Sequence, residues 1–192
     1  MENTNKTLYI IAGANGSGKS TLAYHLLPVK RLEFLNADEI AREINPEAID
    51  KVKITAGKEY FKRLKTFFDN EKSFIIETTL SGQTLEKTIQ KAKNLNYEII
   101  LIYVFIDNPR ICIERIKVRV KNGGHNIPDE DVIRRYKRSR ENFYHLYKNL
   151  VDEWAVYYNG KNNFVEVFKY ENGSIEILQN LLYTEFTKGL KI

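Results

Sequence analysis

The chain carries the stretch LYIIAGANGSGKST at residues 8–21. Its apolar first half predicts a buried strand, and the glycines and the Lys-Ser-Thr that follow predict a tight turn leading into a helix. Residues 13–20 match the pattern G-x-x-x-x-G-K-[ST] at every fixed position. Glycines let successive backbone N–H groups converge on an anion, and the following helix adds its positive dipole end. The stretch therefore predicts a phosphate-binding loop.

This loop supplies the residues that we expect to bind a nucleotide. Lys19 is expected to reach the β- and γ-phosphates, and the hydroxyl of Ser20 is expected to bind Mg²⁺. The expected nucleotide-binding residues are Gly13, Asn15, Gly16, Ser17, Gly18, Lys19, Ser20 and Thr21.

Length and composition favour one domain over residues 1–192, because a chain of 192 residues can bury a complete α/β core. The net charge of +5 indicates an anionic partner. Seven arginines fall within residues 110–140, and such a local cluster favours the phosphates of substrate and ATP over nucleic acid. The single cysteine, Cys112, fits a reducing compartment, and no stretch reaches the length of a membrane span. We therefore expect a cytoplasmic protein.

Short apolar segments alternate with helical patterns along most of the chain. The strand candidates are residues 8–12, 32–35, 73–76, 99–106 and 154–158. Asn172-Gly173 lies between two further apolar runs, which predicts a β-hairpin followed by a helix. We therefore predict an α/β fold of the P-loop NTPase or kinase type, with a doubly wound, mostly parallel, five-stranded sheet and a C-terminal β-hairpin and helix.

Polar residues follow two of these strands, at the sheet edge where parallel α/β sheets bind ligands. Asp38 either accepts the proton of a substrate hydroxyl or caps the next helix, and the residues alone leave both interpretations open. Glu77 is expected near Mg²⁺ or the substrate. Thr79 is expected to contact the substrate, with local turn hydrogen bonds as the alternative.

Arginine-bearing helical segments flank Gly123-Gly124 and predict a lid over about residues 115–138. Closing it would bring guanidinium groups onto the transferred phosphoryl and exclude water. A solvated basic surface is the alternative. We expect Arg119 and Arg134, nearest the glycine hinge, to act on phosphate, and His125 to contact the substrate.

The segments GANGSGKST, LNADEIAREINP, SFIIETTLSG and RVKNGGHNIPDEDVIRRYKRS together resemble the zeta-toxin-like P-loop kinases, in particular their short, single-domain bacterial branch. The resemblance covers about residues 6–160. It implies ATP and Mg²⁺ as cofactors, with Asp38 as catalytic base and Glu77 as a substrate- or metal-side carboxylate. It also implies a sugar-nucleotide acceptor such as UDP-N-acetylglucosamine and a small antitoxin partner, although the longer substrate-binding insertions of the best-known toxins are missing.

Residues and resemblance together favour an ATP-dependent kinase that transfers the γ-phosphate to a hydroxyl of a small metabolite. The alternatives are a P-loop NTPase that hydrolyses ATP in a regulatory or nucleic-acid-associated role, and a nucleotide-binding module with little turnover. The expected catalytic residues are Lys19, Asp38, Arg119 and Arg134; the expected substrate-binding residues are Asp38, Glu77, Thr79 and His125; the expected metal ligands are Ser20 and Glu77.

Overall fold

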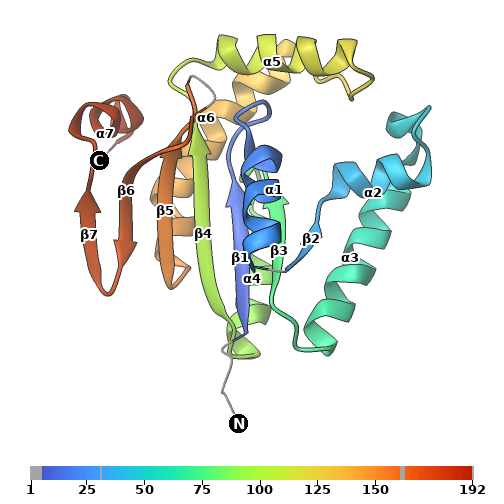
Figure 1. Ribbon diagram of the computed structural model, residues 1–192, viewed down its shortest axis with the longest axis horizontal. Helices are drawn as coiled ribbons and strands as arrows, with labels where there is room; N and C mark the ends of the chain where they lie inside the picture. The colour runs from blue at the N-terminus through green and yellow to red at the C-terminus, as the bar shows by residue number, and fades with distance from the viewer. Residues whose placement is uncertain (1–5, 31, 161–162, 192) are drawn as a thin grey trace.

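The computed structural model describes residues 6–30, 32–160 and 163–191, which form a seven-stranded sheet of order β2-β3-β1-β4-β5-β6-β7 (Figure 1). The strands are β1 (Thr7–Ala12), β2 (Glu33–Leu35), β3 (Phe74–Thr78), β4 (Glu98–Phe105), β5 (Glu153–Tyr158), β6 (Val165–Glu171) and β7 (Ser174–Ile177). The helices are α1 (Lys19–Lys30), α2 (Ala37–Ile44), α3 (Lys53–Asp69), α4 (Leu85–Asn94), α5 (Pro109–Lys121), α6 (Asp129–His145) and α7 (Asn180–Thr187), with short 3-10 turns η1 (Ile49–Val52) and η2 (Tyr147–Asn149).

Strands β1 to β5 pair with one another only in parallel. In the middle of β1, Ile10 lies beside Ile76 of β3 and Leu101 of β4, and none of these three side chains is exposed. A parallel strand enclosed on both faces is apolar throughout, which explains the continuous apolar run at the start of the chain. The predicted α/β fold with a mostly parallel sheet is confirmed.

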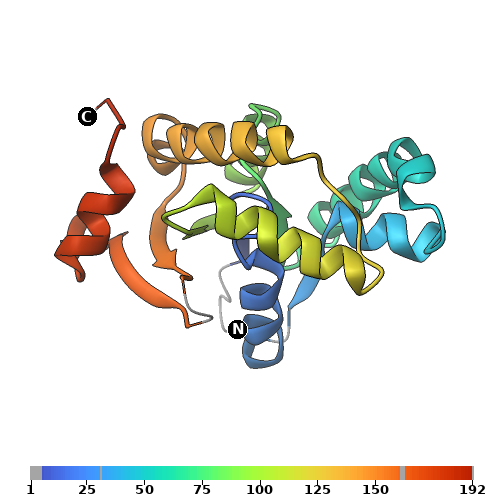
Figure 2. The same ribbon diagram turned by 90° about the horizontal axis from the view of Figure 1, so that it is seen from above.

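Helices cover both faces of this sheet. Ala23 of α1 packs with Ile11 and Ile75 on one face, whereas Ile89 of α4 and Phe143 of α6 belong to the larger core on the other. Figure 2 shows α1 and α6 on opposite sides of the strands. The doubly wound arrangement leaves the carboxyl ends of the parallel strands open between the helices, where ligands bind in such folds.

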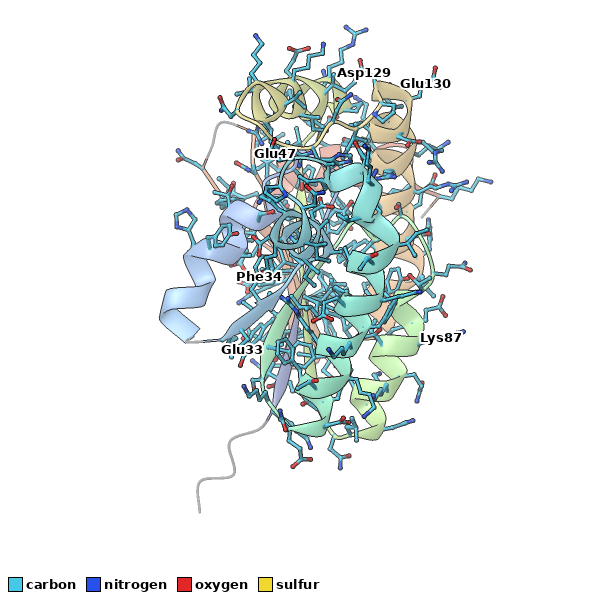
Figure 3. All side chains as sticks on the ribbon, turned by 90° about the vertical axis from the view of Figure 1, so that its right-hand side faces the viewer. Glu33, Phe34, Glu47, Lys87, Asp129 and Glu130 are labelled. Atoms are coloured by element: carbon cyan, nitrogen blue, oxygen red, sulfur yellow. The ribbon has the colours of Figure 1, made fainter. Side chains whose placement is uncertain are left out.

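Charged side chains point outward from the helices, as seen from the side in Figure 3. Asp129 and Glu130 stand in the first turn of α6, where their charge complements the helix dipole, and Lys87 points away from α4. In the part of the chain that the structure describes, no helix is both long and apolar enough to cross a bilayer.

The C-terminal hairpin belongs to the sheet, which corrects the predicted five strands to seven. Strand β6 pairs antiparallel with β5, with Trp154 opposite Tyr170, and β7 forms the outer edge. Asn172 and Gly173 have φ angles of 54° and 78°, as a two-residue hairpin turn requires. The hairpin joins because β5 would otherwise expose an unpaired edge, and α7 then places Phe186 in the core.

Candidate active site

The glycine-rich loop joins β1 to α1 at the carboxyl end of the sheet. Gly13 has a φ of +142°, and a Cβ there would lie 2.1 Å from the carbonyl oxygen of Val104 in β4. Gly16 has a φ of +81°, and a Cβ there would lie 2.6 Å from the carbonyl oxygen of Cys112 in α5. Conformation and space both exclude a side chain at these positions. The glycines thus let the loop lie directly on β4 and α5.

Lys19 opens α1 and is only 5% exposed. Its Nζ donates to the carbonyl of Ala14 at 2.9 Å and lies 3.7 Å from Oε1 of Glu77. The buried Oγ of Ser17 finds no hydrogen-bond partner within the described residues. An ammonium with one close carbonyl and one more distant carboxylate keeps donor capacity for phosphate oxygens.

Glu77, the second-last residue of β3, connects three segments of the chain through hydrogen bonds. Its Oε2 accepts hydrogen bonds from Ser20 Oγ at 2.7 Å and from Asn36 Nδ2 at 3.0 Å. Because Ser20 lies on α1 and Asn36 follows β2, this carboxylate fixes the phosphate loop relative to the start of α2. The two expected metal-binding residues are therefore in direct contact.

Asn36 caps α2 and was not anticipated as a site residue. Its Oδ1 accepts from the backbone N–H of Asp38 at 2.8 Å, while its Nδ2 holds Glu77. The capping role that one interpretation gave to Asp38 belongs to Asn36. The carboxylate of Asp38 accepts no hydrogen bond from the described residues and lines the pocket.

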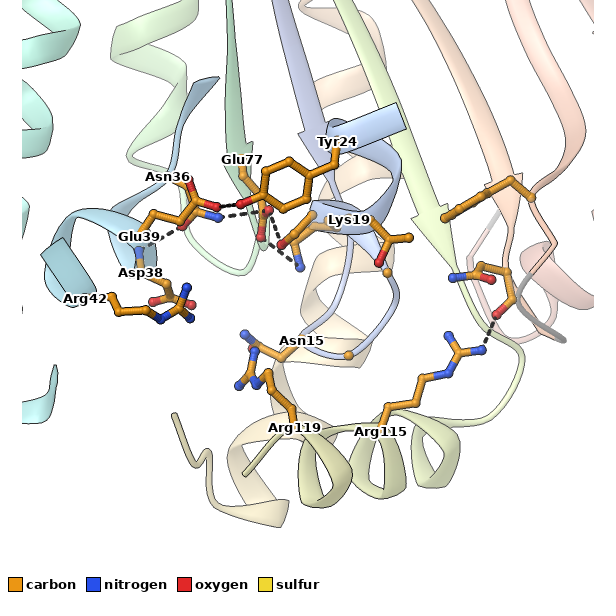
Figure 4. Close-up of a pocket in the computed structure, with 16 residues that line it drawn as sticks. Asn15, Lys19, Tyr24, Asn36, Asp38, Glu39, Arg42, Glu77, Arg115 and Arg119 are labelled. Atoms are coloured by element: carbon orange, nitrogen blue, oxygen red, sulfur yellow. Dashed lines mark hydrogen bonds and ion pairs between the residues drawn. The ribbon is translucent and has the colours of Figure 1, made fainter. Parts of the chain in front are cut away.

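A pocket of about 440 Å³ opens in front of the loop (Figure 4). The loop and α1 form one wall, the first turns of α2 a second, and α5 a third. It is lined by Asn15, Gly16, Gly18, Lys19, Ser20, Thr21, Tyr24, Asn36, Asp38, Glu39, Arg42, Glu77, Arg115, Arg119, Asn159 and Phe164. Most of the expected nucleotide-binding residues thus face one space together with Asp38 and Glu77.

The donor set at Glu77 fits a magnesium ion. Mg²⁺ binds oxygen ligands and in nucleotide sites takes one or two from the protein, the rest coming from phosphates and water. The Ser20 hydroxyl and the Glu77 carboxylate offer two such oxygens 2.7 Å apart at the mouth of the loop.

A second carboxylate, Glu39, stands beside Asp38 on α2. Burial, followed by repulsion from Glu77, raises the pKa of Glu39 above its usual value. The hydroxyl of Tyr24 donates to Glu39 and bridges α1 and α2 across the pocket. The pocket therefore holds three carboxylates, of which Asp38 alone makes no hydrogen bond through its side chain to the described residues.

Two arginines of α5 reach the pocket. Arg119 lines it, and its Nη2 donates to the carbonyl of His125 at 2.8 Å, while its buried Nε finds no partner within the described residues. Arg115 also lines the pocket and donates to the carbonyls of Asn159 at 3.0 Å and Gly160 at 3.3 Å. The two cations enter from the side opposite α2.

Arg134 lies outside this lining. Its Nη2 donates to Asp131 one turn earlier on α6 at 2.6 Å, and its side chain is 52% exposed. Its neighbour Arg135 instead reaches the loop, where Nη1 donates to Asn15 Oδ1 at 3.3 Å. Of the two arginines expected to act on phosphate, only Arg119 lines the pocket.

His125 and Thr79 also lie outside the lining. His125 Nδ1 is 3.2 Å from Oδ1 of Asp50 in η1, and burial lowers the pKa of the imidazole. The Thr79 hydroxyl lies 2.8 Å from that of Ser81, a local contact of the turn after β3. His125 approaches the site only through its carbonyl, which holds Arg119.

Sequence reasoning missed Arg42 and Asn159, and it placed Arg115 in the lid without selecting it as a residue that contacts phosphate. Arg42 follows Asp38 by four residues, so helical periodicity could have placed it on the same helix face as Asp38. Asn159, which directly follows β5, donates from Nδ2 to the carbonyl of Ser17 at 2.9 Å, and no local pattern indicates that contact.

A parallel sheet with a glycine-rich loop between β1 and α1, and with its lysine and serine turned into a pocket, defines a P-loop domain. The chain belongs to a family described as AAA domain, whose model matches residues 8–143. A Haemophilus influenzae protein, itself described as uncharacterized, is 34% identical over 132 residues, which are 69% of this chain and 93% of the relative.

Solved structures share the fold at low sequence identity. The AvrRxo1-ORF1:AvrRxo1-ORF2 complex with ATP has a TM-score of 0.77 and 14% identity over 97% of this chain, which spans 64% of the length of that protein. A chain of the PezAT toxin–antitoxin system of Streptococcus pneumoniae has a TM-score of 0.66 and 16% identity, covering 98% of this chain and 81% of the other. Shikimate kinase from Acinetobacter baumannii, in complex with shikimate, has a TM-score of 0.51 and 16% identity, covering 96% and 92%.

Proposed function

We propose that this protein is an ATP-dependent kinase that transfers the γ-phosphate to a hydroxyl of a small metabolite. The observation that carries the proposal is the position of Asp38. Its carboxylate faces the same pocket as Lys19 and Ser20, and the capping work at the start of α2 is done by Asn36. A carboxylate free of other hydrogen bonds is suited to accept a proton from a hydroxyl.

Each wall of the pocket has a role in this reaction. The loop and Lys19 bind the β- and γ-phosphates, and Ser20 with Glu77 holds Mg²⁺, which supplies charge neutralisation when bound. Arg119 and Arg115 stabilise the negative charge on the transferred phosphoryl. The opposite end, lined by Asn159 and Phe164, accommodates the nucleoside.

The chemical step is a direct phosphoryl transfer. The acceptor oxygen forms a bond to the γ-phosphorus as the bond to the bridging oxygen of ATP breaks, and ADP leaves. Asp38 takes the hydroxyl proton. Water excluded by the α5–α6 segment would otherwise compete for the phosphoryl, so we propose that residues 115–138 act as a lid.

Two finer proposals follow from the resemblance to zeta-toxin-like kinases and from the fold shared with a toxin–antitoxin protein. UDP-N-acetylglucosamine is the first acceptor to test, and a small antitoxin is a candidate partner. We also propose that residues 1–192 form one domain and act in the cytoplasm.

The test is incubation with Mg-ATP and a metabolite panel that includes UDP-N-acetylglucosamine, with products read by mass spectrometry. We expect Lys19→Ala to lose nucleotide-dependent activity, and Asp38→Ala to bind ATP but lose transfer. Asp69→Ala, at the exposed end of α3, is the matched control for Asp38.

Two outcomes would contradict the proposal. Brisk ADP formation with no phosphorylated product would favour an NTPase. Transfer that survives Asp38→Ala would remove Asp38 as the base. Equal growth of cells expressing the wild type or Lys19→Ala would argue against toxicity while leaving the kinase activity to the first assay.

A further inference from the structure

We infer that the acceptor carries an anionic group, a carboxylate or a phosphate, in addition to the hydroxyl that is phosphorylated, and that Arg42 binds this group. The inference rests on the proposed kinase function and specifies the chemical class of its acceptor.

Arg42 and Asp38 stand on the same face of α2. Residues four apart on a helix lie one above the other, and both line the pocket. Figure 4 shows the guanidinium of Arg42 and the carboxylate of Asp38 turned toward the same part of the pocket, with Arg119 on the opposite wall. An acceptor whose hydroxyl lies against Asp38 therefore has Arg42 beside it.

The charge of Arg42 acts within the protein at longer range, where it partly offsets the raised pKa of the neighbouring Glu39. Within the described residues, its guanidinium makes no hydrogen bond and lies within 4.0 Å of no carboxylate oxygen. Arg63 on the adjacent α3 is the contrast, because Glu43 and Glu59 hold it at 2.7 and 3.1 Å. A guanidinium presents five donors in a planar fork suited to carboxylate or phosphate. An exposed arginine with all of them unused beside the proposed base is matched to an anion on the acceptor.

Other cations of the pocket have partners that orient them toward the nucleotide. Lys19 binds the loop carbonyl of Ala14, Arg115 binds the carbonyls after β5, and Arg119 binds the carbonyl of His125. Arg42 alone enters from the α2 wall, away from the phosphate loop. We therefore assign Lys19, Arg115 and Arg119 to ATP. Arg42 is assigned to the acceptor.

The helix also keeps Asp38 and Arg42 together. Side chains one turn apart have Cβ atoms about 5–6 Å from each other. The start of α2 is anchored to the loop through Asn36 and Glu77 at 3.0 Å. Both side chains therefore rise from one anchored helix face and can contact the same small molecule.

The test uses the small-molecule extract of bacterial cells, separated at neutral pH on an anion-exchange column into retained and unretained fractions. Each fraction is incubated with the full-length protein and Mg-ATP labelled at the γ-phosphate. We expect labelled product from the retained fraction only. Labelled product from the unretained fraction alone would overturn the inference and leave the kinase function standing, whereas ADP formation without labelled product from either fraction would overturn the kinase function itself.

Variants then assign the binding to Arg42. We expect Arg42→Gln to raise the KM for the retained acceptor about 10- to 100-fold, the loss expected for one charge-assisted contact, with a much smaller change in kcat. Arg42→Lys is expected to recover part of the loss, since it restores charge but not the planar fork. Arg63→Gln is the matched control and should leave the KM unchanged.

A positional role for Arg42 predicts a different result. If Arg42 only orients Asp38, Arg42→Gln would lower kcat with an unchanged KM, and the inference would be wrong. Thermal unfolding of the wild type and of Arg42→Gln, each with and without ATP, verifies that both proteins are folded under the assay conditions.

Discussion

Gly124 shapes the turn that holds Arg119 in the pocket, and a methyl group there provides a sharp test of the site. A Cβ at this position would lie 2.5 Å from Cγ and 2.8 Å from the carbonyl oxygen of Arg119. The Gly124 N–H also donates to that carbonyl at 2.9 Å. The methyl group in Gly124→Ala cannot be accommodated without moving Arg119.

The expected size of the effect follows from these distances. Ordinary contacts begin near 3.4 Å, so Cγ of Arg119 has to retreat by about 0.9 Å. Displacement of a catalytic contact by about 1 Å costs roughly 100-fold in rate. Removing the guanidinium with Arg119→Ala is expected to cost about 10²- to 10³-fold. Overpacking lowers the stability of Gly124→Ala by about 1–3 kcal/mol.

The assay is ADP formation from Mg-ATP with the phosphate acceptor present, and folded protein is quantified by thermal unfolding. Gly123→Ala is the matched control: its φ is +79° but no atom lies within 4 Å of an added Cβ. Gly124 does not have a positive φ, so backbone strain would slow Gly123→Ala alone, whereas displacement of Arg119 slows Gly124→Ala. A wild-type rate for Gly124→Ala alongside a slow Arg119→Ala would refute the idea that the turn positions Arg119.

Three further predictions concern the loop, the lid and the core. Gly18→Ala should weaken nucleotide binding at least 10-fold in a fluorescent-nucleotide titration, because φ is +99° and the new Cβ would lie 2.2 Å from Nδ2 of Asn159. Gly57 in α3 has open space around it, so Gly57→Ala should instead stabilise the fold by about 0.5–1 kcal/mol. Burial lowers the pKa of His125 below its ordinary 6.5, so the unfolded chain binds more protons than the folded one. The free energy of unfolding, measured with urea, should therefore fall as the pH drops below 6.5. His125→Gln should weaken this pH dependence, and an unchanged dependence in the variant would contradict the prediction. Tyr103→Phe should lower the free energy of unfolding by about 1–3 kcal/mol, because it leaves the buried Ser139 hydroxyl, 2.9 Å away in the wild type, without its partner. Adding Ser139→Ala should recover most of this loss. If the losses of the two single variants simply add in the double variant, the hydrogen bond does not contribute to stability.

Local patterns were enough to predict the phosphate loop and the parallel part of the sheet. The loop is continuous in the chain, and its glycines, lysine and serine stand at fixed spacing. The apolar runs of β1 and β4 indicate burial on both faces. The same patterns placed Asp38 and Glu77 at strand ends, which the sheet brings to one edge.

The lid shows what local sequence patterns could not predict. Arg119 and Arg134 are equally plausible beside the glycine turn, yet Arg119 lines the pocket while Arg134 pairs with Asp131 on the outside of α6. The choice depends on how α5 and α6 rotate when their apolar faces pack, a property of the assembled core. The attachment of the hairpin to β5 depends likewise on an edge that exists only once the sheet has formed.

By itself, the sequence determined that residues 13–20 form a phosphate loop at the end of a buried strand, because every feature of that motif is local. Only the tertiary structure decided what surrounds it: Glu77 in contact with both Ser20 and Asn36, and Asp38 and Arg42 in the same pocket as the loop. Ser20 and Asn36 lie 57 and 41 residues from Glu77 along the chain, so these contacts are fixed by packing of the core and have no signature in the local sequence.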